Sequence, residues 1–199
     1  KMLTDRAKRI YERKKAELAQ NDQLRPYDGH DTVGMVCVDD ESHVVAATST
    51  SGLFMKRNGR IGDSPFVGSG FYARSQVGGA TATGLGVDIM KGCISEEIVR
   101  RMKEGMPVQQ ACETAVNQLD EILKERRGQA GDISVVAMDC NGNWGCATNI
   151  EGFSFVAATQ HSAPVVYLAH RLDDGHTVFE KADQQWLDAY MHNHSAAVE

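Results

Sequence analysis

The chain has 199 residues, of which 42% are apolar and 24% charged, an ordinary composition for one globular domain with a sizeable core. Its formal charge of −6 at pH 7 argues against a nucleic-acid-binding protein, which would carry a basic surface stripe. No apolar run reaches the length of a membrane-spanning helix, and because the chain begins with Lys1, the sequence leaves the cellular compartment open.

The first 31 residues carry few apolar side chains. Residues 4–19 have the composition of a charged helix that lies in solvent, with Ile10 and Leu18 as its sparse apolar positions. Residues 20–30 form a polar linker with Pro26 and Gly29, and a loop of this kind tolerates a cut in the chain.

The next segment has the pattern of a β-hairpin. Residues 32–38 alternate with a period of two, residues 43–49 are a second β-rich run, and the polar residues 39–42 join them. If the two strands pair in register, Thr50 lies beside Thr32 on the neighbouring strand.

A loop with Gly and Pro at residues 59–70 comes next, followed by short strands at residues 71–73 and 78–82. Residues 83–86, Thr-Gly-Leu-Gly, have the pattern of a turn that leads into a helix. Glycines before a helix also occur in phosphate-binding loops, but the Lys-Ser/Thr of a P-loop and the full dinucleotide fingerprint are absent, so we do not favour that interpretation.

From residue 87 the apolar period changes to three or four. The spacing predicts one helix over residues 87–102 and a second over residues 108–123 that is closed by Gly128. Strands are expected at residues 133–138, 144–148, 153–158 and 165–168, and a terminal helix at residues 183–191. The order of strands, helices and strands predicts sheet layers covered by helices.

The five cysteines are scattered and form no CxxC pair, which argues against a zinc site. Cys140 and Cys146 flank an Asn-Gly turn and could face each other across two strands, but buried free thiols are common, so we expect no bridge. The Met-His-Asn-His run at residues 191–194 is expected to be a chain terminus and not a metal site.

Thr32 is the candidate nucleophile. A threonine hydroxyl reacts poorly unless a base lies next to it, and a cut immediately before Thr32 would make its own α-amino group that base. Taken alone, Thr32 is also an ordinary β-branched residue at the start of a strand.

Four motifs follow one another in the chain: HDTVGM from His30, TSTSG from Thr48, GRIGDSP from Gly59 and GATATGLG from Gly79. In this order and at these separations they resemble the glycosylasparaginase/plant-type asparaginase family of N-terminal-nucleophile hydrolases, over about residues 30–155. The resemblance implies an α+β fold, an αββα sandwich. It also implies a division into residues 1–31, the tail of an α segment, and residues 32–199, a catalytic β chain.

The resemblance further implies a self-processing amidohydrolase that needs neither a metal nor an organic cofactor. Thr32 would attack the carbonyl of Asp31 in the precursor, with Asp31 and His30 serving only this self-cleavage. The freed Thr32 would then cleave the β-amide of N4-(β-N-acetylglucosaminyl)-L-asparagine or a related L-asparagine derivative through a β-aspartyl ester.

The remaining site residues are carried over by motif. Thr50 would hydrogen-bond the nucleophile, although a surface Thr ladder fits the same pattern. The hydroxyl of Thr83 and the N–H of Gly84 would form the oxyanion hole, although a glycine turn serves chain reversal equally. Arg60 and Asp63 would hold the α-carboxylate and the α-amino group of the substrate, although a surface salt bridge has the same spacing.

Two departures from the family pattern stand out. The acidic residue that usually follows the TGxG turn is either shifted or absent here, because Val87 precedes Asp88. Only 31 residues precede Thr32, whereas family precursors carry a long α segment that supplies part of the sheets and an aromatic wall of the pocket, and neither Trp144 nor Trp186 lies in that part. The expected partners are this α segment, a small asparagine-linked substrate and further copies of the processed unit, with no nucleic acid and no membrane.

Two alternatives remain. An isoaspartyl peptidase/L-asparaginase would use the same chemistry on another leaving group, but that branch typically has Gly before the Thr and GDTP in the loop, where this chain has Asp31 and GDSP. A non-catalytic, unprocessed fragment with a binding or structural role is the second alternative.

Overall fold

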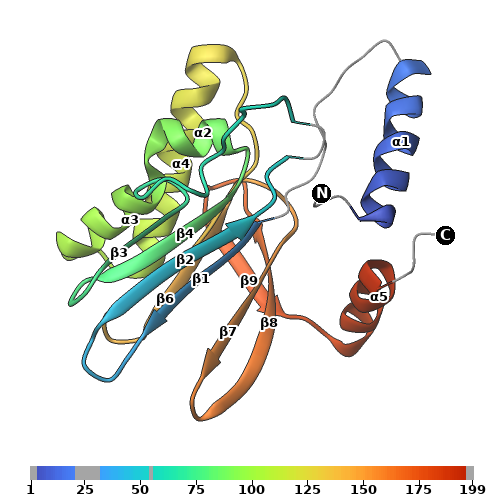
Figure 1. Ribbon diagram of the computed structural model, residues 1–199. Coiled ribbons are helices and arrows are strands. Elements are labelled where there is room, and N and C mark those ends of the chain that lie inside the picture. Colours follow the sequence, from blue (N-terminus) through green and yellow to red (C-terminus); the bar gives the residue numbers. More distant parts are fainter. Residues whose placement is uncertain (1–3, 21–31, 54–55, 196–199) are drawn as a thin grey trace. The chain divides into compact units, whose positions relative to one another are not determined.

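The computed structural model describes residues 4–20, 32–53 and 56–195. Figure 1 shows their helices and strands. The larger of two compact units contains the following elements, in chain order: β1 (Thr32–Val38), β2 (Val44–Thr50), β3 (Phe71–Arg74), β4 (Gly78–Gly84), α2 (Gly86–Gly92), α3 (Ile94–Lys103), α4 (Val108–Arg127), β5 (Ile133–Asp139), β6 (Trp144–Thr148), β7 (Phe153–Thr159), β8 (Ser162–Arg171) and β9 (Thr177–Lys181). The smaller unit contains α1 (Asp5–Gln20), Leu53, residues 56–60 and α5 (Gln184–Ser195).

The smaller unit contains the two terminal helices. In α1, Glu17 lies 3.0 Å from the Lys14 ammonium and 3.9 Å from the Arg13 guanidinium, all on exposed side chains. The prediction of a charged, solvated helix is therefore confirmed. In α5, the Trp186 and Tyr190 rings stack with their centroids 5.0 Å apart. None of the described helices combines the length and apolarity that crossing a membrane requires.

The larger unit is built from antiparallel sheets. The central sheet has the order β3-β4-β5-β6, the hairpin β1-β2 forms a second sheet, and β7-β8-β9 form a third. Helices α2, α3 and α4 cover one face of the central sheet, and β1 and β2 pack against its other face (Figure 1). These mixed helix and sheet layers confirm the predicted α+β class and fit an αββα sandwich.

Side chains along the central strands point alternately into the helix-covered core and to the opposite face of the sheet. Ala82, Ile133 and Val135 point into a core that α3 and α4 close with Ile98 and Val116, all less than 4% exposed. Since neighbours in a strand point to opposite faces, Thr83 and Ser134 lie on the face away from the helices.

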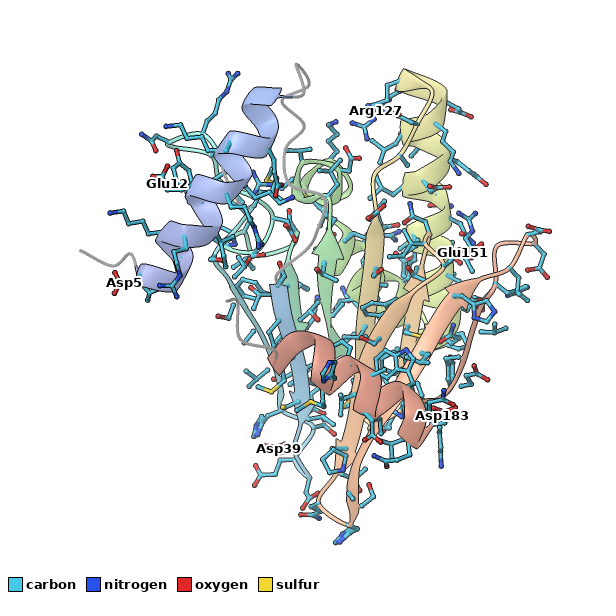
Figure 2. All side chains as sticks on the ribbon, turned by 90° about the vertical axis from the view of Figure 1, so that its right-hand side faces the viewer. Asp5, Glu12, Asp39, Arg127, Glu151 and Asp183 are labelled. Atoms are coloured by element: carbon cyan, nitrogen blue, oxygen red, sulfur yellow. The ribbon has the colours of Figure 1, made fainter. Side chains whose placement is uncertain are left out.

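The β1-β2 hairpin forms with its polar connection as predicted. Asp39 Oδ1 accepts hydrogen bonds from the backbone N–H groups of Glu41 and His43 at 2.9 and 2.8 Å, which closes the turn. Figure 2 labels Asp39 at this turn and Arg127 at the end of α4, at opposite ends of the larger unit. Thr32 begins β1 and therefore lies at the end of the hairpin away from Asp39.

Two local predictions were wrong, and one strand was not predicted. The single helix over residues 87–102 is two helices, because Cys93 has a left-handed conformation (φ 43°) and ends α2 before α3 begins. Strand β4 continues to Gly84, so Leu85 alone separates it from α2. Strand β9 was not predicted, because it is short and contains Glu180 and Lys181.

Candidate active site

Thr32 is the first residue of β1, and its partner across the ladder is Thr50, the last residue of β2. The Thr32 hydroxyl donates to Thr50 Oγ1 at 3.3 Å. Thr50 Oγ1 also accepts the Gly52 N–H at 2.9 Å. The predicted register of the hairpin is thus confirmed, and it brings two hydroxyl groups together at the strand ends.

The hairpin lies very close to β4 at Gly34, two residues after Thr32. A Cβ added to Gly34 would stand 2.6 Å from Thr81 Oγ1 and 2.8 Å from Thr81 Cβ, closer than real Cβ atoms approach. Thr81 is 3% exposed and has little space to move. Only glycine therefore allows this separation between β1 and β4.

A cleft of about 550 Å³ opens between these layers. Its lining comes from residues 32–37 of β1, 81–83 of β4, 134 and 136–138 of β5, 144–145 of β6 and 153–158 at β7. Thr32 and Thr83 both line this cleft. Thr83 Oγ1 is buried and has no hydrogen-bond partner among the described residues. An unsatisfied buried hydroxyl of this kind destabilises a folded protein by about 1–3 kcal/mol. The Thr83 hydroxyl is therefore a hydrogen-bond donor that faces the cleft without contributing to the stability of the fold.

An aromatic cluster borders the same cleft. The Trp144 ring lies 5.4 Å from Phe155, 5.2 Å from Tyr167 and 5.1 Å from Phe179, measured between centroids. Trp144 and Phe155 line the cleft. Trp144 was given no role from the sequence. The feature that could have drawn attention to it is its place at the start of a strand, directly after an Asn-Gly turn.

The oxyanion-hole candidates follow one another at the end of β4. Gly84 has φ 136°, and a Cβ there would stand 2.0 Å from the Asp132 carbonyl oxygen. Next to it, the Leu85 N–H donates to the same Asp132 oxygen at 2.7 Å. The loop around Asp132 therefore determines where the chain turns after Gly84.

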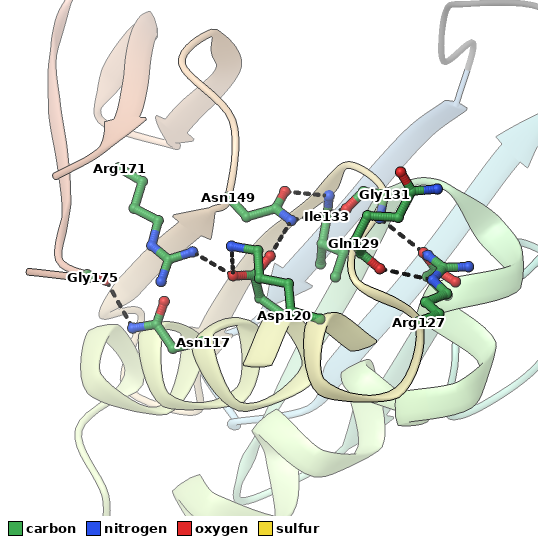
Figure 3. A network of polar contacts seen from close by, with 11 residues as sticks. Asn117, Asp120, Arg127, Gln129, Gly131, Ile133, Asn149, Arg171 and Gly175 are labelled. Carbon is green, nitrogen blue, oxygen red and sulfur yellow. Dashed lines mark hydrogen bonds and ion pairs between the residues drawn. The ribbon is translucent and has the colours of Figure 1, made fainter. Parts of the chain in front are cut away.

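That loop is held by two buried acids and an asparagine (Figure 3). Asp88 Oδ2 accepts the Gly131 N–H at 2.9 Å and also bonds Arg127. Asn149 donates to the Gly131 carbonyl at 2.8 Å and to Asp120 Oδ1 at 3.0 Å. Asp88 does not line the cleft, so the displaced acid of the sequence supports the loop and lies outside the candidate site.

The two proposed substrate-binding residues belong to different units. Asp63 is 5% exposed and belongs to the larger unit with Thr32 and Thr83. Arg60 belongs to the smaller unit, where its N–H donates to the Arg57 carbonyl at 3.1 Å. His30 and Asp31, the residues of the predicted self-cleavage, lie outside the described residues.

All five cysteines lie in the described parts of the chain and are free. Cys140 lies in the turn beyond the β5-β6 ladder and Cys146 pairs with Val136, so the two do not face each other. Burial raises the pKa of the Cys146 thiol to about 12 and that of Cys112 well above its ordinary value. Neither thiol is an activated nucleophile. Within the described parts of the chain, no group of three or more His, Cys, Asp or Glu is arranged to hold a metal ion.

Comparisons with known proteins point to one family. The family model described as asparaginase matches residues 2–168. The chain is 34% identical over 149 residues to an Elizabethkingia miricola N(4)-(β-N-acetylglucosaminyl)-L-asparaginase, covering 72% of this chain and 44% of that protein. A putative Drosophila melanogaster protein of the same name is 37% identical over 150 residues, with 75% and 37% covered.

An isoaspartyl peptidase/L-asparaginase of Danio rerio is 37% identical over 129 residues, covering 65% of this chain and 40% of that protein. The chain thus spans less than half the length of these relatives. Proteins with both names match at similar identity, so identity does not separate the two branches.

Proposed function

This chain belongs to the asparaginase family, and from that premise we propose that it is the catalytic part of a self-processing amidohydrolase with Thr32 as its nucleophile. The observation that carries the proposal is the shared cleft: Thr32, which is hydrogen-bonded to Thr50, and the unpartnered Thr83 hydroxyl line the same space. A nucleophile and an oxyanion donor have to reach one carbonyl group, and a common cleft permits this.

The first reaction is self-cleavage. Thr32 Oγ1 attacks the carbonyl carbon of Asp31, and the peptide nitrogen leaves as the α-amine of Thr32, so that Asp31 is held as an ester. Water hydrolyses the ester, which frees the Thr32 hydroxyl and leaves a carboxylate at the end of Asp31. His30 and the side chain of Asp31 assist proton transfer in this step only.

The second reaction repeats this chemistry on the substrate. The new α-amine takes the Thr32 hydroxyl proton while Oγ1 attacks the side-chain carbonyl of the asparagine derivative. Negative charge develops on the carbonyl oxygen, where the Thr83 hydroxyl and the Gly84 N–H stabilise it. The leaving amine takes the proton, and water then hydrolyses the β-aspartyl ester to release aspartate.

For the leaving group we favour N-acetylglucosaminylamine. The support comes from Asp31 before the nucleophile and from GDSP around Asp63, where the isoaspartyl peptidase branch typically has Gly and GDTP. Hydrolysis rates of N4-(β-N-acetylglucosaminyl)-L-asparagine and a β-aspartyl dipeptide, measured side by side, decide between the two. A faster rate on the dipeptide would favour the alternative branch.

The precursor segment before Thr32 is the proposed partner within the same molecule, and copies of the processed unit associate. Exposed apolar side chains in the lining of the cleft support a covering segment: Val33 is 70% exposed, Met35 53% and Val156 60%. Side chains of this kind are normally covered in an assembled protein.

The test of the proposed function is self-cleavage of the full-length precursor. Purified precursor is incubated and the new N-terminus is sequenced, with Thr32 expected as the first residue. Thr32→Ala should block both splitting and turnover, because one hydroxyl performs both, whereas Thr32→Ser should still split slowly. A start at another residue, or a folded precursor that never splits, would refute the proposal and favour the non-catalytic alternative.

A further inference from the structure

The loop that begins at Asp63 is tied to the rest of the larger unit through its backbone. The Ser64 carbonyl accepts the Thr48 hydroxyl at 2.7 Å, and the Ser69 carbonyl accepts the Ser95 hydroxyl at 2.7 Å. The Gly68 carbonyl accepts the Glu96 N–H at 2.9 Å. These donors come from β2 and from the start of α3, so the loop is held from two sides.

The backbone of the loop also turns back to Asp63, the residue at its start. The Asp63 carbonyl accepts N–H groups from Phe66 at 2.8 Å and from Gly70 at 3.2 Å. A Cβ on Gly70 would stand 2.6 Å from Ser64 Cα, so the two ends of the loop lie against each other. The Gly70 carbonyl then accepts the Ala82 N–H at 2.9 Å, one residue before Thr83. Asp63 is thereby coupled through backbone bonds to the strand that carries Thr83.

Thr48 connects the Asp63 loop to the strand that also contacts the proposed nucleophile. It lies on β2 two residues before Thr50, on the same side of the strand. Its hydroxyl bonds Ser64, the residue next to Asp63, whereas that of Thr50 bonds Thr32. One face of β2 therefore holds the nucleophile with one hydroxyl and the Asp63 loop with another.

We propose that Thr48 is a positioning residue that determines how strongly the protein selects substrates with a free α-amino group. The inference rests on the proposed function and on the role that the family resemblance implies for Asp63, which would bind the substrate ammonium. A single side-chain to backbone hydrogen bond contributes only a small part of the stability of a folded protein. Displacement of a binding group by about 1 Å can nevertheless cost on the order of a hundredfold in rate, so this bond matters more to recognition than to folding.

The experiment uses self-cleaved protein from the full-length precursor and two substrates, glycosylated asparagine and the same amide without its α-amino group. Thr48→Val removes the donor at nearly constant shape, and Thr48→Ser keeps it. We expect Thr48→Val to lower kcat/KM about tenfold for the amino-bearing substrate, mainly through KM, and to leave the deamino analogue nearly unchanged. Thr48→Ser should behave like the wild type.

Ser49→Ala is the matched control, because Ser49 is the next residue on β2, is exposed and points to the other face. Ser95→Ala removes the second tether and should reproduce the same selective loss, which keeps the inference testable if Thr48→Val folds poorly. Equal losses on both substrates, or a Thr48→Val protein that matches Ser49→Ala, would overturn the positioning role alone. A wild-type protein that hydrolyses neither substrate would overturn the proposed function, and the inference with it.

Discussion

A Cβ atom on Gly34 would stand 2.6 Å from Thr81 Oγ1, so the backbone of β1 rests directly on the side chain of Thr81. Gly34 lies two residues after Thr32, and Thr81 lies two residues before Thr83. Since both strands are regular in this region, their contact determines how far the proposed nucleophile lies from the proposed oxyanion donor.

Gly34→Ala should therefore push β1 away from β4. We expect a loss of about 1–3 kcal/mol in the free energy of unfolding, typical of overpacking, together with slower self-cleavage. Denaturant unfolding and the rate of precursor splitting measure the two effects. Gly152→Ala is the control, because a Cβ there has no neighbour within 4 Å. If Gly34→Ala were as stable and as fast as this control, the contact would not determine the site geometry.

Arg60 should recognise the α-carboxylate of the substrate. Arg60→Ala should lower kcat/KM by an amount equal to about 2–3 kcal/mol, which is what losing a charge-assisted contact costs. Arg60→Lys should restore only part of this, because an ammonium lacks the planar fork of the guanidinium. Arg57→Ala, an exposed arginine three residues earlier, is the control for loss of charge in this segment. A near-normal kcat/KM in Arg60→Ala would remove Arg60 from the site.

The strands and helices with strong periodicity could be predicted from the sequence, and the break at Cys93 could not. Met90, Ile94 and Ile98 continue one apolar spacing across it, and a single left-handed residue leaves no trace in such a pattern. Gly128, in contrast, ends α4 as predicted, because glycine is the usual residue at a left-handed helix end.

The same contrast applies to the candidate site. The neighbourhood of Thr32 and Thr50 was predictable, because a short hairpin has few registers. The hydrogen bonds from Thr48 and Ser95 to the Asp63 loop were not predictable, because their acceptors are backbone carbonyls, which every residue has. Arg60 and Asp63 lie three residues apart in the sequence, and their assignment to different units could not be predicted from that spacing.

The ionisation of Asp120 should make the free energy of unfolding depend on pH in the acidic range. Burial alone would raise its pKa, but hydrogen bonds from Lys124, Asn149 and Arg171 outweigh burial and lower the pKa below the ordinary value of 3.8. The folded state thus holds the charged form more strongly than the unfolded chain does. This contribution is present above the unfolded-state pKa and is lost as pH falls through the lower folded-state pKa.

Asp120→Asn should therefore lower the free energy of unfolding by about 2 kcal/mol at pH 7, since it removes the charge that Lys124 and Arg171 face. The difference from the wild type should shrink as pH falls below about 4. Urea unfolding at a series of pH values measures this. Glu121→Gln, the exposed neighbour, should change little. A deficit that stayed constant down to pH 2 would contradict the role of the charge.

Thr83 should contribute to the transition state more than to substrate binding. An oxyanion donor meets its charge only as the tetrahedral intermediate forms, so losing it should lower kcat on the order of a hundredfold with little change in KM. Thr83→Val keeps the shape and removes the buried, unpartnered hydroxyl. The assay has to use protein already split at Thr32, because a processing defect would mimic a catalytic one.

Ser134→Ala is the matched control for Thr83→Val. Ser134 pairs with Thr83 across β4 and β5 and lines the same cleft, but its hydroxyl bonds Thr148 Oγ1 at 2.8 Å. Thr148 Oγ1 still accepts the Ile150 N–H at 3.2 Å when Ser134 loses its hydroxyl, so this oxygen keeps a partner. Its removal should therefore change kcat much less than that of the Thr83 hydroxyl. An unchanged kcat with a raised KM in processed Thr83→Val would instead place Thr83 in ground-state binding, because a contact made equally in the bound substrate and the transition state changes only KM.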